Sequence, residues 1–311
     1  MGLSDVWRRN KDVISNSLNE QELPGQPPEL IFGNMIGSHY ILESVIHEGG
    51  MGKIYLAHHN KKNIRVAVKT IRVDNTGDNA KQLYNRFRRE AKGLALLTHP
   101  NIVRILGCDL HDPKQAYIVM EYVDGQTLWK FMGQHREGVL IHVFLQIMVQ
   151  LCSAFDLLHK KGIVHRDLKP NNVMISGDVR QYSIKILDLG LIFFEKALTN
   201  TAALKLTRKG QLVGTPAYMS PEQCRGDEVT HLSDIYNLGL IAYELLSGRP
   251  VNHGKNPADM FVKQLKVKPK PLHSLRPEVP LKISEAIQCA LEKDPKMRPQ
   301  SSREFFDAMH F

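Results

Sequence analysis

Short apolar runs separated by turn residues fill the chain from Tyr40 to about Val123. The stretch "YILESVIHEGGMGKIYLAHH" predicts two strands joined by a glycine turn. The stretch "NIRVAVKTIRV" predicts a third strand, in which Val66 and Val68 alternate with other residues at the period of a strand. Next, "KQLYNRFRREAKGLALL" has apolar residues at helical spacing. The runs "RILGCDL" and "AYIVMEYV" then complete a small, mostly β part.

After Gly125 the chain is predicted to be mainly helical. Two short predicted strands, near Val173–Ile175 and Ser183–Leu187, interrupt this helical part. The predicted helices are Val139–Lys160, Ser233–Leu246, Pro257–Lys266, Ile283–Glu292 and Ser302–Met309. The first forty residues are polar and include "ELPGQPPEL", which cannot continue a helix or a sheet. We therefore expect an α+β fold in which a polar arm precedes a small β-rich part and a larger helical part.

Composition places the chain among ordinary globular proteins. It has 311 residues, 42% hydrophobic and 23% charged, a length that suits one large domain or two lobes. The net charge of +9 favours acidic partners, either phosphate-bearing ligands or nucleic acid, unless it is only a solvated basic surface. The sequence contains no CxxC pair, so neither a metal knuckle nor a disulfide framework is predicted. Four cysteines are expected as small buried or half-buried side chains: Cys108, Cys152, Cys224 and Cys289.

No targeting or anchoring segment is predicted. No apolar run approaches the roughly 20 residues that cross a bilayer, and "MGLSDVWRRNK" has no signal-peptide core. Val6 stands where a myristoylation signal has Ser or Thr. We expect a cytoplasmic location and no membrane span in this chain, although the sequence is also compatible with a piece of a longer, membrane-anchored protein.

The glycine turn and the third strand carry the first candidate chemistry. Gly49, Gly50 and Gly52 let the backbone approach a phosphate without a Cβ clash, although hairpins of this kind also occur without a ligand. Lys69 stands on an otherwise apolar strand, so its ammonium needs a nearby anion unless it reaches solvent at a sheet edge. Glu90, on the helix that follows, is its candidate partner.

The stretch "IVHRDLKPNN" concentrates charged and amide side chains in an order that a simple turn does not need. Five such elements follow one another: "GGMGKIY", "VAVK", "HRDLKPNN", "DLG" and "GTPAYMSPE". Together they resemble the eukaryotic-type (Hanks-type) serine/threonine protein kinases, bacterial members above all, from about Tyr40 to the C-terminus. The resemblance implies a bilobal protein kinase fold with an arm or linker at 1–39, an N-lobe at 40–123 and a C-lobe at 124–311.

The resemblance also implies an activity, transfer of the γ-phosphoryl group of ATP to Ser or Thr hydroxyls of proteins. Asp167 would accept the proton of the attacking hydroxyl, and Lys169 would lie beside the transferring phosphoryl group. Asn172 and Asp188 would hold Mg²⁺, with Mn²⁺ as the alternative, because both supply the oxygen ligands that hard cations prefer.

ATP is expected to bind between the β-rich and helical parts. Lys69 would hold its α- and β-phosphates, and Glu90 would hold Lys69. The backbone from Glu121 to Val123 would bind the edge of the adenine, and Met120 would close the back of the pocket. The residues expected at the nucleotide are Ile46, His47, Glu48, Gly49, Gly50, Met51, Gly52, Lys53, Ile54, Ala67, Lys69, Glu121, Val123 and Met174. Core packing is the alternative explanation of the apolar ones.

Two further matches concern how the site is supported. Glu222 and Arg298 match a buried ion pair that anchors the family's substrate-docking segment. Asp234, in "DIYNLG", matches a helix aspartate that braces the catalytic loop. We therefore expect all three side chains to be buried and paired.

Two departures from the family pattern bear on activity. His47 replaces the first glycine of the phosphate loop, and Leu189 replaces the middle residue of Asp-Phe-Gly. Neither change removes a catalytic group. A pseudokinase, a nucleotide-binding scaffold without turnover, is the alternative. Pseudokinases usually lack the strand lysine, the loop aspartate or the metal-binding aspartate, whereas this chain has Lys69, Asp167 and Asp188. A nucleic-acid-binding protein is the other alternative, and only the net charge favours it. We expect an active kinase with no nucleic-acid partner.

The last expectation concerns regulation. Arg166, directly before the catalytic aspartate, is a cation whose natural partner is a phosphate on the segment between Asp188 and Glu222. Autophosphorylation is therefore expected at Thr207 first and at Thr201 second, in trans within a transient dimer, with an unmodified polar loop as the alternative.

Overall fold

The computed structural model describes residues 35–37, 39–49, 52–70, 97–109, 116–187, 216–251 and 256–310. The chain divides into two compact units, Met1–Ile31 and Phe32–Phe311, and every described residue belongs to the second. Most of the helix expected over 81–97 lies outside the described residues.

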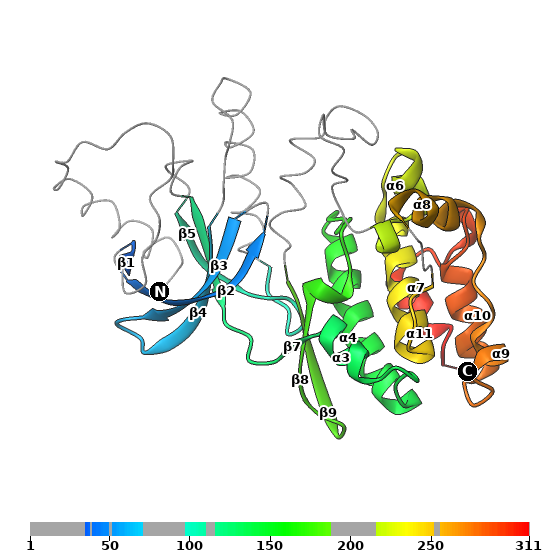
Figure 1. Ribbon diagram of the computed structural model, residues 1–311, viewed down its shortest axis with the longest axis horizontal. Coiled ribbons are helices and arrows are strands. Elements are labelled where there is room, and N and C mark those ends of the chain that lie inside the picture. The colour runs from blue at the N-terminus through cyan, green and yellow to red at the C-terminus, as the bar shows by residue number, and fades with distance from the viewer. Residues whose placement is uncertain are drawn as a thin grey trace. The chain divides into compact units, whose positions relative to one another are not determined.

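The first architectural feature is a six-stranded antiparallel sheet in the order β1-β2-β3-β4-β6-β5 (Figure 1). Its strands are β1 (Met35–Ile36), β2 (Tyr40–Gly49), β3 (Gly52–His59), β4 (Ile64–Thr70), β5 (Ile105–Asp109) and β6 (Tyr117–Glu121). The predicted pattern of strand, glycine turn, strand and third strand is confirmed. The sheet begins before Tyr40, because Met35 and Ile36 pair with β2.

Alternation along β4 separates the two faces of this sheet. Val66 and Val68 are fully buried, and Val119, the partner of Val68 in β6, is buried as well. Ala67 points to the opposite face, which it shares with Met120 because directly opposed residues of paired strands lie on the same side. Both Ala67 and Met120 are half-buried. One face therefore belongs to the core, and the other is the one expected to receive the nucleotide.

The second part contains a small sheet and the helices (Figure 1). The sheet has the order β7-β8-β9, formed by β7 (Gln126–Thr127), β8 (Val173–Asp178) and β9 (Gln181–Ile186). The helices are α3 (Leu128–Gln134), α4 (Ile141–Lys160), α6 (Pro221–Arg225), α7 (His231–Ser247), α8 (Pro257–Lys266), α9 (Leu272–Leu275), α10 (Leu281–Ala290) and α11 (Ser302–Asp307). Three-residue 3₁₀ turns occur at Pro170–Asn172, Pro216–Tyr218 and Pro295–Met297.

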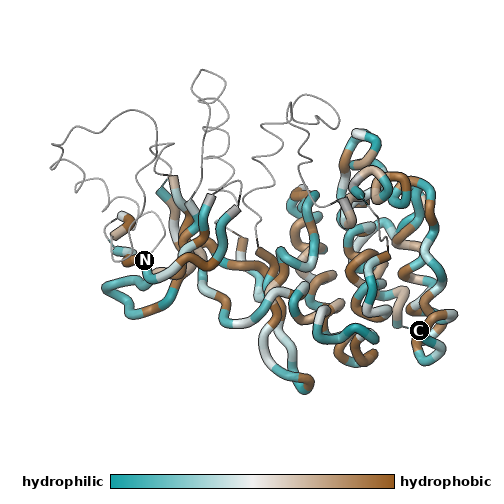
Figure 2. Tube along the Cα trace, viewed as in Figure 1, coloured by the Kyte–Doolittle hydropathy of each residue, from teal (hydrophilic) through white to brown (hydrophobic). Residues whose placement is uncertain are grey.

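All five predicted helices are confirmed within a few residues at each end. Hydrophobic and hydrophilic positions are mixed along these helices (Figure 2), and α7 is buried on nearly all sides, from Ser233 to Leu246. Helices α3, α6 and α9 were not predicted from the sequence, and they are only seven, five and four residues long. Elements this short do not complete enough turns to show a helical period.

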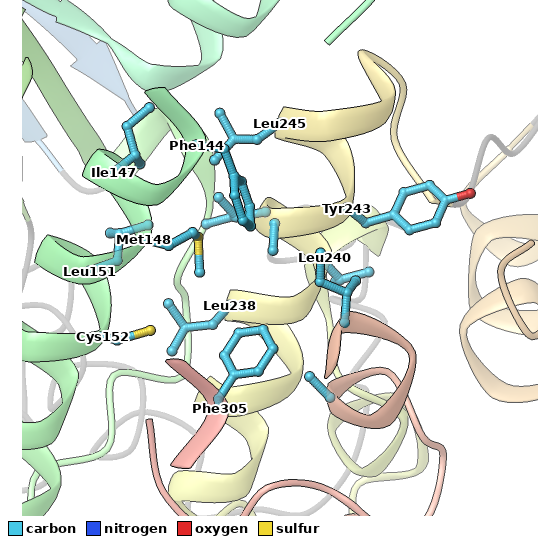
Figure 3. Close-up of a cluster of buried hydrophobic side chains, with 14 of the residues drawn as sticks. Phe144, Ile147, Met148, Leu151, Cys152, Leu238, Leu240, Tyr243, Leu245 and Phe305 are labelled. Atoms are coloured by element: carbon cyan, nitrogen blue, oxygen red, sulfur yellow. The ribbon is translucent and has the colours of Figure 1, made fainter. Parts of the chain in front are cut away.

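The core of the helical part lies where α4, α7 and α11 pack together. Figure 3 shows Phe144 and Met148 of α4 beside Leu238 of α7 and Phe305 of α11, and all four are buried. Gly239 lets α7 approach α10 closely, because a Cβ there would meet the Ala290 Cβ at 3.0 Å. Large side chains therefore set the distance between α4 and α7, and Gly239 sets the shorter distance between α7 and α10.

Helix α4 is long and apolar enough to cross a bilayer by length and composition, and it is the one such helix in the described part of the chain. The expectation that no apolar run approaches this length was therefore wrong. Nine of its side chains are buried in the core. Its apolar character thus serves the interior of the domain.

The cysteines are free thiols. Cys152 and Cys224 are buried and Cys108 is half-buried, as predicted. The prediction was wrong for Cys289, which is exposed.

Candidate active site

The loop between α4 and β8 gathers three of the predicted site residues. Lys169 Nζ donates to Asp167 Oδ2 at 2.8 Å, and Asn172 Nδ2 donates to the same oxygen at 3.2 Å. Asn172 Nδ2 also donates to the backbone carbonyl of Asp167 at 2.9 Å. The 3₁₀ turn Pro170–Asn172 makes this convergence possible, because it returns the chain toward Asp167. Among the described residues, Asp167 Oδ1 has no hydrogen-bond partner.

A buried carboxylate holds the backbone of this loop. Asp234 of α7 is completely buried, and its Oδ2 accepts from the backbone N–H of His165 at 2.8 Å. Its Oδ1 accepts from the backbone N–H of Arg166 at 2.9 Å, and His159 Nε2 donates to Oδ2 at 2.9 Å. Arg166 has φ +68°, a left-handed conformation that is unfavourable for a residue with a Cβ. Asp234 therefore offsets backbone strain directly before Asp167, and the predicted brace is confirmed.

Lys69 and its neighbours occupy the half-buried face of the first sheet. Lys69 is 8% exposed and pairs with Ile54 of β3 and Ile118 of β6. Because Ala67 precedes it by two residues, the side chains of Ile54, Ala67 and Lys69 lie on one side of the sheet. The structure thus brings together three residues that were predicted at the nucleotide.

The hairpin between β2 and β3 carries most of the other predicted nucleotide residues. Gly49 and Gly52 are paired at its end. The preceding pair is Glu48 and Lys53, whose carboxylate and ammonium lie 3.3 Å apart. His47 is exposed and pairs with Ile54, while a register shift leaves Ile46 unpaired in the ladder and 50% exposed. The turn therefore starts from a two-stranded ladder with two register shifts, one between Leu42 and Ser44 and one at Ile46.

The backbone of Glu121 was predicted to bind the adenine, and its side chain forms hydrogen bonds within the protein. Its Oε1 accepts from Lys185 Nζ of β9 at 2.6 Å and from the backbone N–H of Arg104 at 2.8 Å. Val123 follows β6 and is half-buried, as is Met174 on β8, the cross-strand neighbour of Lys185. Lys185 was not among the predicted site residues, because its partner Glu121 is 64 residues away and no local pattern points to it.

The predicted ion pair of the substrate-docking segment is present. The guanidinium of Arg298 donates from Nη1 to Glu222 Oε1 at 2.8 Å and from Nη2 to Glu222 Oε2 at 2.9 Å, and both residues are 3% exposed. Burial by itself raises the pKa of Glu222. The hydrogen bonds and charge of Arg298, together with the hydroxyl of Ser233, outweigh burial and lower this pKa. The carboxylate thus stays ionised inside the protein.

A second contact, which was not predicted from the sequence, joins this segment to the catalytic loop. Gln223 Nε2 donates to the backbone carbonyl of Arg166 at 2.6 Å. Ser220 and Gln223 also form a capping box at the start of α6. The order Ser-Pro-Glu-Gln was the signal that could have predicted this helix start and the orientation of Gln223. The segment that ends in α6 therefore lies against the loop that carries Asp167.

The remaining predicted positions lie outside the described residues. These are Gly50, Met51, Glu90, Asp188, Thr201 and Thr207. The second Mg²⁺ ligand, the partner of Lys69 and the modification sites therefore stay predictions. Within the described ranges no group of three or more His, Cys, Asp or Glu side chains could hold a metal ion.

An α+β fold, a strand with a buried lysine and a loop that joins Asp167, Lys169 and Asn172 define a catalytic domain of the protein kinase class. The sequence model described as the protein kinase domain matches residues 40–309, and the chain belongs to this family. The family assignment and the expected fold class are thereby confirmed.

Curated relatives and solved structures agree with this assignment. The chain is 37% identical over 272 residues to a probable serine/threonine-protein kinase of Streptomyces coelicolor, covering 86% of this chain and 39% of that protein. It is 34% identical over 273 residues to the serine/threonine-protein kinase PknB of Mycobacterium leprae, covering 86% and 42%. The chain thus spans about two fifths of the length of these relatives.

Two solved structures are also similar. The PknI kinase domain of Mycobacterium tuberculosis superposes with a TM-score of 0.67 at 26% identity, covering 90% of this chain and 98% of that one. Rad53 1-466 in complex with AMP-PNP superposes with a TM-score of 0.70 at 26% identity, covering 86% and 64%.

Proposed function

We propose that this domain is an ATP-dependent serine/threonine protein kinase. The observation that carries the proposal is the position of Asp167, whose Oδ2 receives Lys169 and Asn172 while Oδ1 has no partner among the described residues. An oxygen in this state can accept a proton from a hydroxyl group. The relatives that match the chain are named serine/threonine-protein kinases, and the Rad53 structure holds AMP-PNP, which supports a nucleotide as co-substrate.

The chemistry follows from these contacts. Asp167 takes the proton of the attacking Ser or Thr hydroxyl and orients it in line with the γ-phosphorus. Lys169, 2.8 Å from Asp167, carries the cation that offsets charge on the transferring group. Phosphoryl transfer has a loose transition state, so positioning and neutralisation of charge supply most of the rate enhancement.

The metal site rests on the chemistry of its donors. The amide nitrogen of Asn172 is occupied by two bonds to Asp167, so the amide oxygen remains as an acceptor. A neutral amide oxygen together with the carboxylate of Asp188 suits Mg²⁺, and Mn²⁺ accepts the same ligands. When bound, the metal neutralises charge on the phosphates. On this chain Asn172 and Asp188 would hold it.

The nucleotide would bind on the half-buried face of the first sheet. Lys69 lies on this face and would pair with the α- and β-phosphates, with Glu90 as its support. Ala67 and Ile54, both half-buried, would contact the adenine from one side, and the half-buried Met174 of β8 would contact it from the other. The hairpin ending in Gly49 and Gly52 would cover the phosphates. The side chain of Glu121 is held by Lys185, which leaves its backbone as the part that can bind the ring edge.

The proposed function also assigns a role to each part of the chain. Residues 40–123 would form the N-lobe, 124–311 the C-lobe and 1–39 a linker or arm. Proteins with Ser or Thr acceptors are the substrates, and a second copy of the chain is one of them during autophosphorylation at Thr207 or Thr201. The domain would act in the cytoplasm, and two observations support this location: the cysteines are free, as in a reducing compartment, and the proposed reaction consumes ATP.

The test is incubation of the protein with γ-labelled ATP, Mg²⁺ and an acceptor protein. Label on Ser or Thr in the wild type, and none in Asp167→Asn, would support the proposal. Asp307→Asn is the matched control, because Asp307 is an exposed carboxylate on α11 that pairs with Arg303, and this variant should transfer label normally. Nucleotide binding without transfer in the wild type would instead identify a pseudokinase.

A further inference from the structure

A continuous chain of hydrogen bonds connects the residues after α10 with the turn that precedes α6. Lys293 Nζ donates to the hydroxyl of Tyr236 on α7 at 2.9 Å. This hydroxyl donates to Gln264 Oε1 on α8 at 2.7 Å, and Gln264 Nε2 donates to the backbone carbonyl of Ala217 at 2.6 Å. Tyr236 and Gln264 are completely buried. We call this series the Lys293 relay.

The relay has only one consistent direction. Gln264 must present its amide nitrogen to the carbonyl of Ala217, so its oxygen faces Tyr236 and accepts. The single hydroxyl proton of Tyr236 is then committed to Gln264. The oxygen of Tyr236 therefore needs a donor on its other side, and Lys293 supplies it. Each bond polarises the next, so a positive charge at Lys293 strengthens the bond that ends on Ala217.

The end of the relay lies in the segment that contacts the catalytic loop. Ala217 belongs to the 3₁₀ turn Pro216–Tyr218, which leads directly into the capping box of α6. From there Gln223 reaches the carbonyl of Arg166, next to Asp167. Residues that shift this turn will therefore shift the surface along which a Ser or Thr side chain approaches Asp167.

Lys293 is surrounded by groups that determine its charge. Burial lowers its pKa to about 8, and the guanidinium of Arg298 and the ammonium of Lys268 act in the same direction. Cys224 and the carboxylate of Glu292 act against them. Lys268 is itself paired with Glu292 at 2.8 Å. The hydroxyl of Tyr236 also faces Lys293, and burial raises its pKa, so that Tyr236 stays neutral at every pH considered below.

We propose that Lys293 is a positioning residue, whose ammonium holds the turn Pro216–Tyr218 through Tyr236 and Gln264 in the conformation that accepts a protein substrate. The inference rests on the proposed kinase function and deepens it. It predicts that the charge on Lys293 sets the affinity for the protein substrate, while ATP binding and the phosphoryl-transfer step depend on other residues. The relay weakens as pH rises from about 7 to about 9, because the ammonium then loses its proton.

The kinetic test uses dephosphorylated casein as the acceptor, at about pH 7 and about pH 9. In the wild type, KM for casein should rise about three- to tenfold between these values, as expected when a charge-assisted hydrogen bond becomes a neutral one. KM for ATP should not rise between these two pH values. Lys293→Met should show the high casein KM already at pH 7 and lose the pH dependence, and Lys293→Arg should keep the low KM at both values. Lys296→Met, an exposed lysine on the following turn, is the control and should behave as wild type.

A second readout does not depend on catalysis. At about pH 7, hydrogen exchange in a peptide covering 216–222 should be several-fold faster in Lys293→Met than in the wild type or Lys293→Arg. Tyr236→Phe cuts the relay without touching the lysine and should reproduce both effects, which keeps the test decisive if Lys293→Met does not fold. If the wild type transfers no phosphate, the proposed function fails, and hydrogen exchange alone decides on the relay. Equal exchange, together with equal casein KM profiles, in the wild type and Lys293→Met would overturn the inference.

Discussion

The buried pair of Glu222 and Arg298 offers a quantitative test of how this domain is held together. Their side chains are 4% and 0% exposed, so the value for a fully buried pair applies without discount for solvent. Removing one partner from such a pair costs roughly 3–5 kcal/mol, because the other charge stays buried and unpaired. We expect the loss of stability in Glu222→Gln to lie near the lower end of this range, since the amide oxygen still accepts from the guanidinium.

The loss of stability in Arg298→Met should lie at or above the upper end of that range. Arg298 also donates to the backbone carbonyls of Leu232, Glu292 and Lys293, and these acceptors would lose a partner together with Glu222. Each buried acceptor left without a donor adds about 1 kcal/mol or more. The double variant Glu222→Leu with Arg298→Met should recover part of the loss, because two apolar side chains leave no stranded charge.

The pH dependence gives this prediction its sharpest form. In the wild type the folded-state pKa of Glu222 is lowered, so the unfolded chain binds more protons in the acid range. The pair therefore stabilises the protein above the unfolded pKa of about 4.3, and this contribution is lost as pH falls through the folded value. In Arg298→Met burial remains and its counter-charge is gone, so the folded-state pKa of Glu222 rises. The stability deficit of this variant should then shrink from about pH 7.5 to about pH 5.

The assay is equilibrium urea denaturation, followed by circular dichroism, for the wild type, both single variants and the double variant at the two pH values. The coupling energy of the double-mutant cycle isolates the pair from the other bonds of Arg298. A deficit of Arg298→Met that is the same at both pH values, or a coupling energy below about 1 kcal/mol, would refute the reasoning. Such a result would mean that the pair behaves as an exposed one.

Three further predictions test other parts of the site. Asp167→Asn should keep nucleotide binding in calorimetry and lose about 10²- to 10⁴-fold in kcat, and near-native turnover would contradict its role as proton acceptor. His47→Gly should stay active and change KM for ATP more than kcat, because the hairpin mainly binds phosphates; a collapse of kcat would reveal a chemical role for the histidine. Lys185→Met should cost no more than about 1 kcal/mol in thermal denaturation, since its pair with Glu121 is partly exposed, and a larger loss would show a structural latch.

Local patterns in the sequence predicted the elements and the contents of the catalytic loop. The strand period around Val66 and Val68 and the helical period of α4 report which face of an element is buried, because such a period needs only residues a few positions apart. Asp167, Lys169 and Asn172 lie within six residues of one another, so one short turn is enough to bring them together. Short or terminal elements escaped this reasoning. Helix α3 has only seven residues, and its start depends on the cap at Thr127.

Which distant residues meet was decided by the tertiary structure. The resemblance to kinases supplied Glu222 with Arg298, but no pattern in the chain pointed to Lys185 as the partner of Glu121 or to Gln223 at the carbonyl of Arg166. The Lys293 relay likewise joins four separate segments of the chain. The physical reason is that a buried polar group must find a hydrogen-bond partner, yet its own neighbours in sequence do not determine which one. Packing of helices and sheets brings the partner within reach, and periodicity in the sequence reports only that a side chain is buried.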